Sequence, residues 1–234
     1  MSTTSWHDHV VNVEHRRAAW LDSIAPSAGR RSGLGAEAPP GREPITLTSI
    51  HRTIVVVDIA GFGDHRRNNT NQIRIRRGLY DAIHDAFSAA DISWNLCHSE
   101  DRGDGLLVLA SAELRKPLFA DRLPGTLAAA LARHNATHPV EEQIRLRLAL
   151  HAGEVNYDDH GVTSTSITCT FRLVNARKLK EVHAQSDAAL AIIASGWFFD
   201  EVIRHSERSQ ADFYQPVTIR NKETTASAWI RLLW

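Results

Sequence analysis

Two aspartates stand where a chain can build a metal site. Asp58 ends the apolar run TIVVVDI, and Asp104 lies in the turn-forming stretch EDRGDG. Taken alone, each is explained more simply as a residue that ends a strand or forms a turn. Together, two carboxylates at neighbouring strand ends would offer the oxygen ligands that Mg²⁺ prefers, with substrate phosphates completing its coordination sphere. The pair therefore predicts metal-assisted chemistry on a phosphorylated substrate.

The stretch after Asp58 supplies a loop suited to phosphate. Gly61, Phe62 and Gly63 follow the strand end, and two of the three lack a Cβ atom. Backbone amides in such a loop can approach phosphate oxygens closely, particularly where the loop leads into a helix. The loop therefore predicts nucleotide contacts beside the metal ligands.

These residues need a sheet that brings Asp58 and Asp104 to the same edge, and hydrophobic periodicity predicts one. We expect strands over 53–59, 92–100, 106–112, 144–155, 211–219 and 225–233, and helices over 72–90, 123–136, 166–184 and 187–203, the last broken at Gly196. This order favours an α/β (α+β) sandwich of ferredoxin-like character, with a mostly antiparallel sheet covered by helices. A central hairpin would then hold Asp104 next to the first strand.

The first 46 residues differ in composition from the rest. The stretch SWHDHVVNVEHRRAAWLDSIA has loosely helical spacing, and PSAGRRSGLGAEAPPGREP is typical of a flexible linker. A docking helix on a tether and a partly disordered tail explain this segment equally well. We therefore expect an N-terminal appendage over 1–46 and one catalytic domain over 47–234.

Composition excludes several classes of protein. Lys+Arg and Asp+Glu both count 27, so net charge gives no reason to expect nucleic-acid binding. Two cysteines without a CxxC pair argue against a disulfide framework and a structural zinc site. No apolar stretch is long enough to span a membrane, and the N-terminus lacks a signal-peptide layout. The expectation is a soluble, cytoplasmic protein without a membrane partner.

Four stretches, VVVDIAGFGDHRR, SEDRGDGLLVLA, IRLRLALHAGEV and STSITCTFRLVNARKL, together resemble the successive blocks of class III nucleotidyl cyclases. In that family the blocks read roughly FxDIxGFT, KxxGDxxM, RxGIHxGxV and NxVNxAxRL. The resemblance covers about Arg52 to Leu232, and its specificity lies in the order and spacing of the blocks. It implies conversion of a nucleoside triphosphate to the 3′,5′-cyclic monophosphate and pyrophosphate.

The resemblance implies roles for particular residues. Asp58 and Asp104 match the two metal aspartates, and the carbonyl of Ile59 would also touch a metal, with two Mg²⁺ or Mn²⁺ ions per site. Arg172 matches the arginine that stabilises the transition state, a role that suits a charged group binding phosphate oxygens bidentately. The resemblance further implies a homodimer with shared active sites, each built from both subunits.

The last turn, TIRNKETT, resembles the region where the family places a basic phosphate contact. Arg220 and Lys222 are both candidates for that contact. Two positions depart from the family pattern. Thr168 stands where the family has a catalytic asparagine, and its hydroxyl can still donate one hydrogen bond. Glu100 stands where adenylate cyclases have the lysine that contacts adenine, and a carboxylate cannot donate to adenine N1.

A site that keeps the phosphate chemistry and changes the base contact is similar to the bacterial pyrimidine cyclases of anti-phage defence, which make cyclic UMP or cyclic CMP. The resemblance favours UTP, with a downstream effector that senses the product. Glu100 alone does not distinguish the bases, because a carboxylate accepts from uracil N3–H or from the exocyclic amine of cytosine.

Other functions stay open at this point. One alternative is an adenylate or guanylate cyclase with an atypical base pocket. Another is a catalytically degenerate homologue that binds nucleotide and regulates without chemistry, which the changes at Thr168 and Glu100 would favour. A diguanylate cyclase would carry GG[DE]EF at the hairpin turn, and RGDGLL does not supply it. An interaction module working through the N-terminal helix is a further alternative.

Overall fold

The computed structural model describes residues 49–221 and 224–234. The expected N-terminal helix and linker over 1–46 lie outside the described residues, and so does Lys222. The domain boundary expected near residue 47 therefore stays a prediction.

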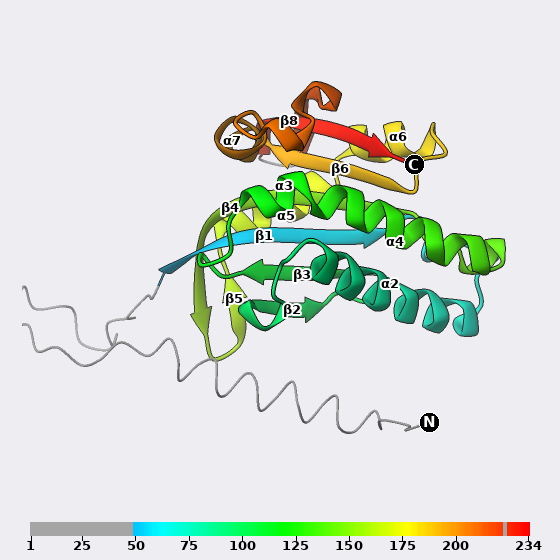
Figure 1. Ribbon diagram of the computed structural model, residues 1–234. Coiled ribbons are helices and arrows are strands. Elements are labelled where there is room, and N and C mark those ends of the chain that lie inside the picture. Colours follow the sequence, from blue (N-terminus) through cyan, green and yellow to red (C-terminus); the bar gives the residue numbers. More distant parts are fainter. Residues whose placement is uncertain (1–48, 222–223) are drawn as a thin grey trace, which may run out of the picture. The chain divides into compact units, whose positions relative to one another are not determined.

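The domain is built on one eight-stranded sheet (Figure 1). Its order is β2 (Cys97–Asp101), β3 (Gly105–Ala110), β1 (Ser49–Ile59), β4 (Leu146–Asp158), β6 (Leu190–Ser195), β8 (Thr224–Leu233) and β7 (Gln215–Asn221), with β5 (Gly161–Thr163) paired to β4. Only β4 and β6 run parallel among these pairs. This confirms the predicted α+β sandwich with a mostly antiparallel sheet.

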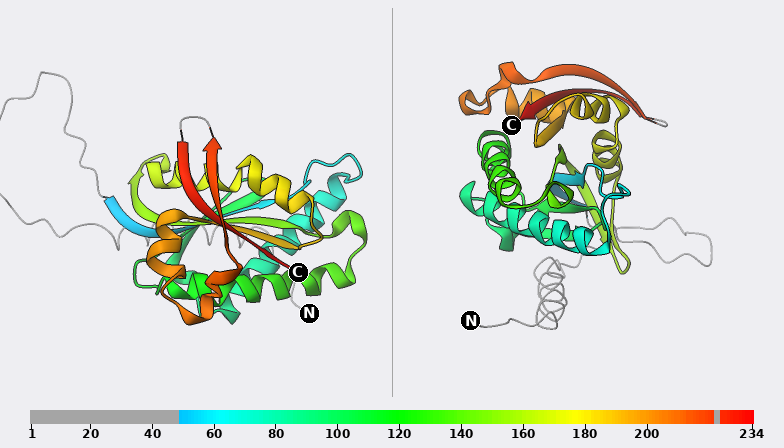
Figure 2. Two further views of the ribbon diagram at one scale, coloured as in Figure 1. Left: turned by 90° about the horizontal axis from the view of Figure 1, so that it is seen from above. Right: turned by 90° about the vertical axis from the view of Figure 1, so that its right-hand side faces the viewer.

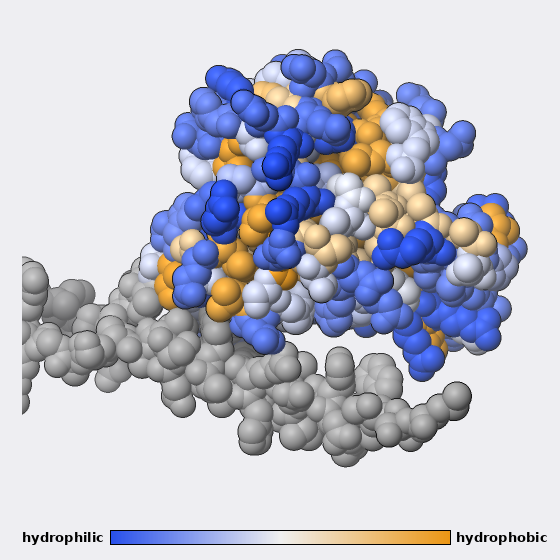
Figure 3. All heavy atoms as spheres, in the orientation of Figure 1, coloured by the Kyte–Doolittle hydropathy of each residue, from blue (hydrophilic) through white to orange (hydrophobic). Residues whose placement is uncertain are grey.

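Helices cover both faces of the sheet (Figure 2). One face packs against α2 (Asn69–Ala89), α3 (Pro117–Asp121) and α4 (Leu123–Thr137), and the other against α5 (Thr165–Val174) and α6 (Arg177–Ala184). A short α7 (Gly196–Phe198) continues into a π-helical turn, Phe199–Ile203. Hydrophilic residues cover most of the described surface in Figure 3, because the apolar side chains fill the two core layers.

The alternation of side chains along β1 determines which face of the sheet Asp58 lies on. Its central valines and isoleucine are at most 2% exposed, as expected for a strand covered on both faces. Successive side chains point to opposite faces, so Val55 and Val57 join the layer under α2 and α4, while Ile54 and Val56 join the layer under α5 and α6. Asp58 continues the second series and therefore faces the α5–α6 side.

One predicted element is wrong in type. Residues 187–203 were expected to form a helix, but Leu190–Ser195 form strand β6, between β4 and β8. All six residues of β6 are buried. An apolar run buried on both faces has no alternation, so periodicity cannot distinguish it from a buried helix.

Smaller corrections concern boundaries. The helix expected over 166–184 is two helices, α5 and α6, separated at Asn175 and Ala176. The strand expected over 92–100 begins only at Cys97, after a 3₁₀ turn at Trp94–Leu96, and a similar turn at Ala211–Phe213 precedes β7. The sequence did not predict α3 or β5. In the described part of the chain, no helix is both long enough and apolar enough to cross a membrane.

Candidate nucleotide and metal site

Strand pairing brings the two aspartates to the same edge of the sheet. In the β1–β3 register Asp58 lies opposite Gly105, one residue after Asp104. The amide of Ile59 donates to the carbonyl oxygen of Asp104 at 2.9 Å. Burial raises the pKa of Asp58, and the charge of Asp104 adds a smaller contribution in the same direction. The structure therefore places both carboxylates, and the Ile59 backbone, in one neighbourhood.

A tight hairpin fixes Asp104. Gly103 has φ +81°, and a Cβ on Gly105 would lie 2.1 Å from the Val57 carbonyl oxygen, so both positions need glycine. The Asp101 carboxylate stabilises this turn by accepting a hydrogen bond from the Gly103 amide at 2.8 Å. Arg76 of α2 donates to both carboxylate oxygens of Asp101, at 2.6 and 3.2 Å. The hairpin that carries Asp104 is thus tied to the helix beside it.

Arg147 binds the carboxylate of Asp58. The two residues lie opposite each other in the β1–β4 register, and Arg147 Nε donates to Asp58 Oδ2 at 2.7 Å, with a second bond from Nη2 to the same oxygen. The side chains are only 14% and 16% exposed. Burial raises the pKa of Asp58, and the guanidinium opposes that rise. Arg147 is not among the site residues predicted from the sequence.

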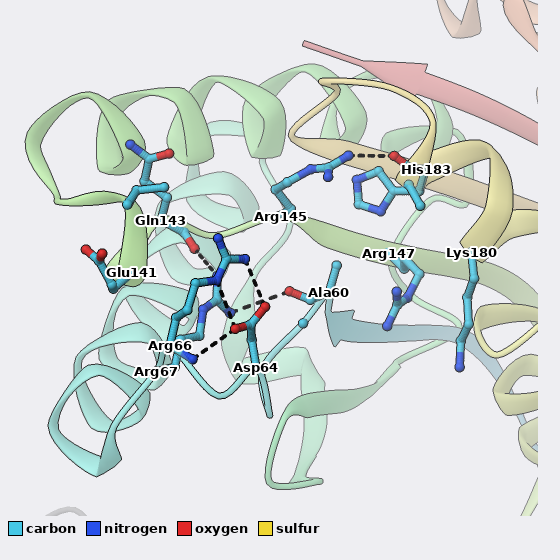
Figure 4. A pocket seen from close by; sticks show the side chains of 13 residues that line it. Ala60, Asp64, Arg66, Arg67, Glu141, Gln143, Arg145, Arg147, Lys180 and His183 are labelled. Atoms are coloured by element: carbon cyan, nitrogen blue, oxygen red, sulfur yellow. Dashed lines mark hydrogen bonds and ion pairs between the residues drawn. The ribbon is translucent and has the colours of Figure 1, made fainter.

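A basic pocket opens next to this ion pair (Figure 4). It is formed by the loop after β1, the segment before β4 and one side of α6, and its charged or titratable lining residues are Asp64, Arg66, Arg67, Glu141, Arg145, Arg147, Lys180 and His183. In Figure 4, Arg147 and Lys180 extend in the same direction from β4 and α6. An excess of cations beside two carboxylates is suited to a metal-bound polyphosphate.

Several of these cations are already held by the protein. Arg66 forms an ion pair with Asp64 at 2.9 Å. Arg67 donates to the carbonyl oxygen of Gln143 at 2.9 Å. Arg145 donates to three backbone carbonyls at the end of α6 and in the loop after it, at distances of 2.6, 2.7 and 3.1 Å. These guanidinium groups build the walls of the pocket.

His183 closes one side of the pocket as a neutral group. It is 1% exposed, and its Nε2 lies 3.0 Å from the Ala188 carbonyl oxygen. Burial, followed by the charge of Arg145, lowers the pKa of His183 to about 4. The imidazole therefore adds no positive charge to the pocket at neutral pH.

The glycine loop borders two hollows. Gly61, with φ +67°, lines the basic pocket, while Phe62 and Gly63 line a second hollow that also includes Asp104. A Cβ on Gly61 or Gly63 would meet no atom within 4 Å, so the space beside the loop is open. The Phe62 carbonyl oxygen accepts a hydrogen bond from Gln72 of α2 at 3.3 Å, which holds the loop against that helix.

Thr168 and Arg172 share one face of α5, since residues four apart on a helix are neighbours. The helix begins after Ser164, whose side chain accepts from the Ile167 amide at 2.9 Å. Thr168 is exposed, and its hydroxyl donates to the Ser164 carbonyl oxygen at 3.1 Å. α5 packs closely on β4 because Gly153 leaves room there, where a Cβ would lie 2.1 Å from the Ser166 hydroxyl oxygen.

Arg220 is not brought to the aspartates within one chain. It is exposed on β7, at the edge of the sheet, four strands away from β1 in the order β1–β4–β6–β8–β7. At about 4.8 Å per strand, this separation is on the order of 19 Å. Lys222, the other candidate phosphate contact, lies outside the described residues.

Glu100 is oriented from two sides. Its Oε2 accepts from Arg102 Nη2 at 2.6 Å, and its Oε1 lies 3.2 Å from His98 Nε2. The Arg102 guanidinium lies over the ring of Phe171 in α5, with 5.3 Å between the guanidinium carbon and the ring centroid. Glu100 lies opposite Leu107, which belongs to the core layer under α5 and α6, and therefore faces the same side of the sheet as Asp58.

The donor set fits a hard divalent cation. Both hydrogen bonds that Asp58 receives fall on Oδ2. Among the described residues, neither Asp58 Oδ1 nor the Asp104 carboxylate has a hydrogen-bond partner. No group of three or more His, Cys, Asp or Glu side chains gathers within residues 49–221 and 224–234. Two carboxylates suit Mg²⁺ or Mn²⁺, because such ions usually keep several waters and bind substrate phosphates.

Comparisons with known proteins identify the fold. No family model matches the sequence, and no curated protein matches it. The guanylyl cyclase Cya2 is 15% identical with a TM-score of 0.54, over 79% of this chain and 91% of the other. The adenylate/guanylate cyclase/hydrolase from Silicibacter pomeroyi is 16% identical with a TM-score of 0.54, over 80% and 99%. The guanylate cyclase domain of RhGC from Catenaria anguillulae, in complex with GTP, is 16% identical with a TM-score of 0.51, over 79% and 98%. The chain therefore has the fold of class III cyclase catalytic domains.

Proposed function

We propose that this protein is a nucleotidyl cyclase, which converts a nucleoside triphosphate to the 3′,5′-cyclic monophosphate and pyrophosphate. The observation that carries the proposal is the convergence of Asp58 and Asp104 at one sheet edge, beside a basic pocket, in a chain with the cyclase fold. In this reaction the ribose 3′-oxygen attacks the α-phosphorus in line, and pyrophosphate leaves.

Each proposed residue has a defined task. Asp58, Asp104 and the Ile59 carbonyl would hold two Mg²⁺ or Mn²⁺ ions, which supply neutralisation of the triphosphate charge and lower the pKa of the ribose hydroxyl. The backbone of the loop 61–63 approaches the phosphates. Arg172 stabilises the charge that develops on the α-phosphate, and Thr168 donates a hydrogen bond nearby.

We propose a homodimer with shared sites, in which Asp58 and Asp104 of one subunit meet Arg172, Thr168 and Arg220 of the other. The distance between β1 and β7 supports this, since Arg220 cannot serve the aspartates of its own chain. Mixing the inactive variants Asp58→Ala and Arg172→Ala tests it. Random pairing yields half heterodimers, each with one intact site, so about a quarter of the normal activity returns. No recovery in a confirmed heterodimer would place each site within one chain.

We propose a pyrimidine nucleotide, with UTP favoured, as the substrate. Glu100 is compatible with this, because a carboxylate held between Arg102 and His98 accepts hydrogen bonds and cannot donate. It can receive uracil N3–H, and equally N1–H and the exocyclic amine of guanine, so it argues against adenine alone; the preference for UTP rests on the resemblance to pyrimidine cyclases. We further propose that cyclic UMP is a second messenger in anti-phage defence and that an effector senses it. This step rests on the resemblance to bacterial pyrimidine cyclases alone.

The decisive experiment offers ATP, GTP, CTP and UTP separately, with Mg²⁺ or Mn²⁺, and identifies cyclic monophosphates by mass spectrometry. We expect cyclic UMP, and its loss in Asp58→Ala. Product from a purine nucleotide instead would support the atypical adenylate or guanylate cyclase. Glu100→Lys is expected to lower UTP turnover more than the conservative Glu100→Gln, because an ammonium repels the donor at N3.

One observation favours a second candidate function. Arg147 already occupies an oxygen of Asp58, as it would in a homologue that binds nucleotide without chemistry. Nucleotide binding in calorimetry, with no cyclic product from any of the four triphosphates, would establish that alternative.

A further inference from the structure

The Asp58–Arg147 ion pair points to a switch within the site. We propose that Arg147 is a displaceable counter-ion: it competes with metal for Asp58 and moves to the phosphates when a metal-bound polyphosphate enters. This inference rests on the proposed function, because it takes Asp58 as a metal ligand. It adds that metal and polyphosphate binding are coupled through one side chain.

The contact is arranged so that guanidinium and metal compete for one carboxylate. Arg147 directs two N–H groups at the single oxygen Oδ2 of Asp58. Both side chains are largely withdrawn from solvent, so water screens their charges weakly. A divalent cation on this carboxylate, even through the free Oδ1, would place like charges a few ångströms apart. Arg147 therefore opposes metal binding at Asp58, and metal binding favours its movement away.

The pocket offers Arg147 a second position. Arg145 and Arg67 are held by backbone carbonyls, and Arg66 by Asp64. Arg147 instead depends on the one carboxylate that the metal would take. Its side chain extends beside Lys180 into the basic pocket (Figure 4). A guanidinium binds phosphate as readily as carboxylate, and in both cases bidentately. Polyphosphate in this pocket would therefore receive the displaced group.

The consequence is thermodynamic coupling. Metal alone must bind against the charge of Arg147, for which the pocket then holds no phosphate, and so binds weakly. Polyphosphate supplies the missing acceptor and strengthens metal binding, and metal strengthens polyphosphate binding by the same factor. Coupling between two sites commonly amounts to about 5- to 150-fold in affinity, and we expect at least about tenfold here.

The test measures Mn²⁺ affinity by electron paramagnetic resonance, with and without inorganic tripolyphosphate. Three proteins are compared: the unmodified chain, Arg147→Met, and the control Arg66→Met. The control removes the same charge from the same pocket without touching Asp58. We expect Arg147→Met to bind Mn²⁺ alone about tenfold more tightly and to lose most of the enhancement by tripolyphosphate. Tripolyphosphate also chelates Mn²⁺ in solution, but this effect is the same in all three measurements and does not alter their comparison.

Two results would overturn the inference. Unchanged Mn²⁺ affinity in Arg147→Met would show that no competition exists. The same gain in Arg66→Met would show that pocket charge in general, and not the contact with Asp58, controls the metal. If Arg147→Met fails to fold, Arg147→Lys replaces it, since a lysine cannot place two N–H groups on Oδ2 in the same fork; we expect an intermediate gain, and no gain overturns the inference equally.

The measurement is independent of turnover. Coupling through Arg147 without cyclic product from any nucleotide would refute the proposed function and keep the inference. Cyclic product with unaltered Mn²⁺ binding in Arg147→Met would refute the inference and leave the proposed function standing. Asp58→Asn is expected to abolish Mn²⁺ binding and leave the spectrum of free Mn²⁺, which confirms that the ion measured is the one at this carboxylate.

Discussion

His183 makes the stability of the domain depend on pH, and the size of the effect follows from its burial. Its imidazole is 1% exposed and lies 3.0 Å from the Ala188 carbonyl oxygen. Burial lowers its pKa from 6.5 to about 4. The unfolded chain therefore takes up a proton, as pH falls through 6.5, that the folded chain does not. His183 thus contributes stability at neutral pH that is lost progressively between about pH 6.5 and pH 4.

The magnitude comes from linkage. A pKa difference of one unit corresponds to about 1.4 kcal/mol, so the full effect below pH 4 approaches about 3 kcal/mol. At about pH 5 the loss is on the order of 2 kcal/mol, whereas at about pH 7.5 it is close to zero. In a domain of this size, about 2 kcal/mol corresponds to roughly 4–8 °C in melting temperature.

The assay is urea unfolding at about pH 7.5 and about pH 5, on the unmodified chain and on His183→Gln. Glutamine retains an N–H donor near the Ala188 carbonyl but does not titrate in this range. We expect the drop in unfolding free energy between the two pH values to be smaller by about 2 kcal/mol in the variant. His65→Asn, at a side chain that is 93% exposed, serves as the control for replacing a histidine by an amide. An equal drop in His183→Gln and the unmodified chain would refute the reasoning.

Four further substitutions, one of them a control, test the site and its supports. Gly105→Ala should destabilise the domain by about 3 kcal/mol in thermal melts, because the new Cβ meets a β1 carbonyl oxygen at 2.1 Å, whereas Gly63→Ala, which has open space, should not. Arg76→Leu should lower turnover in the proposed cyclase reaction through the hairpin of Asp104, while costing only about 1 kcal/mol in unfolding free energy, since its ion pair with Asp101 is partly exposed. Arg172→Lys should lower kcat by about 10²-fold with little change in KM, and an equal rise in KM instead would point to ground-state binding.

The sequence was sufficient to predict the edge of the sheet where Asp58 and Asp104 meet. The β-branched run before Asp58 and the turn residues around Asp104 are local features, and local features specify a strand end and a hairpin. Gly61, Gly63 and the helix after them were also accessible in this way. The roles assigned to these residues stay predictions, since geometry alone does not test chemistry.

Strand β6 could not be identified from the sequence, and this affects the whole sheet. Leu190–Ser195 pair with β4 on one side and β8 on the other, and both faces are covered. Such a strand has no polar side, so its pattern is identical to that of a buried helix. Without β6, the sequence could not show that β7 lies four strands from β1, nor that Arg220 is therefore remote from Asp58.

The pattern around Arg147 contains a signal for its ion pair. In IRLRLALHAGEV the arginines alternate with leucines, which suggests a half-buried strand with its arginines in water. β4 is instead an interior strand with helices over both faces, so a charged side chain on it must find a partner within the protein. If the strand over 144–155 pairs with the strand over 53–59, the acidic residue on that neighbouring strand is Asp58. An arginine on an interior strand between apolar neighbours therefore predicts a carboxylate partner on the adjacent strand, and here that partner is the proposed metal ligand.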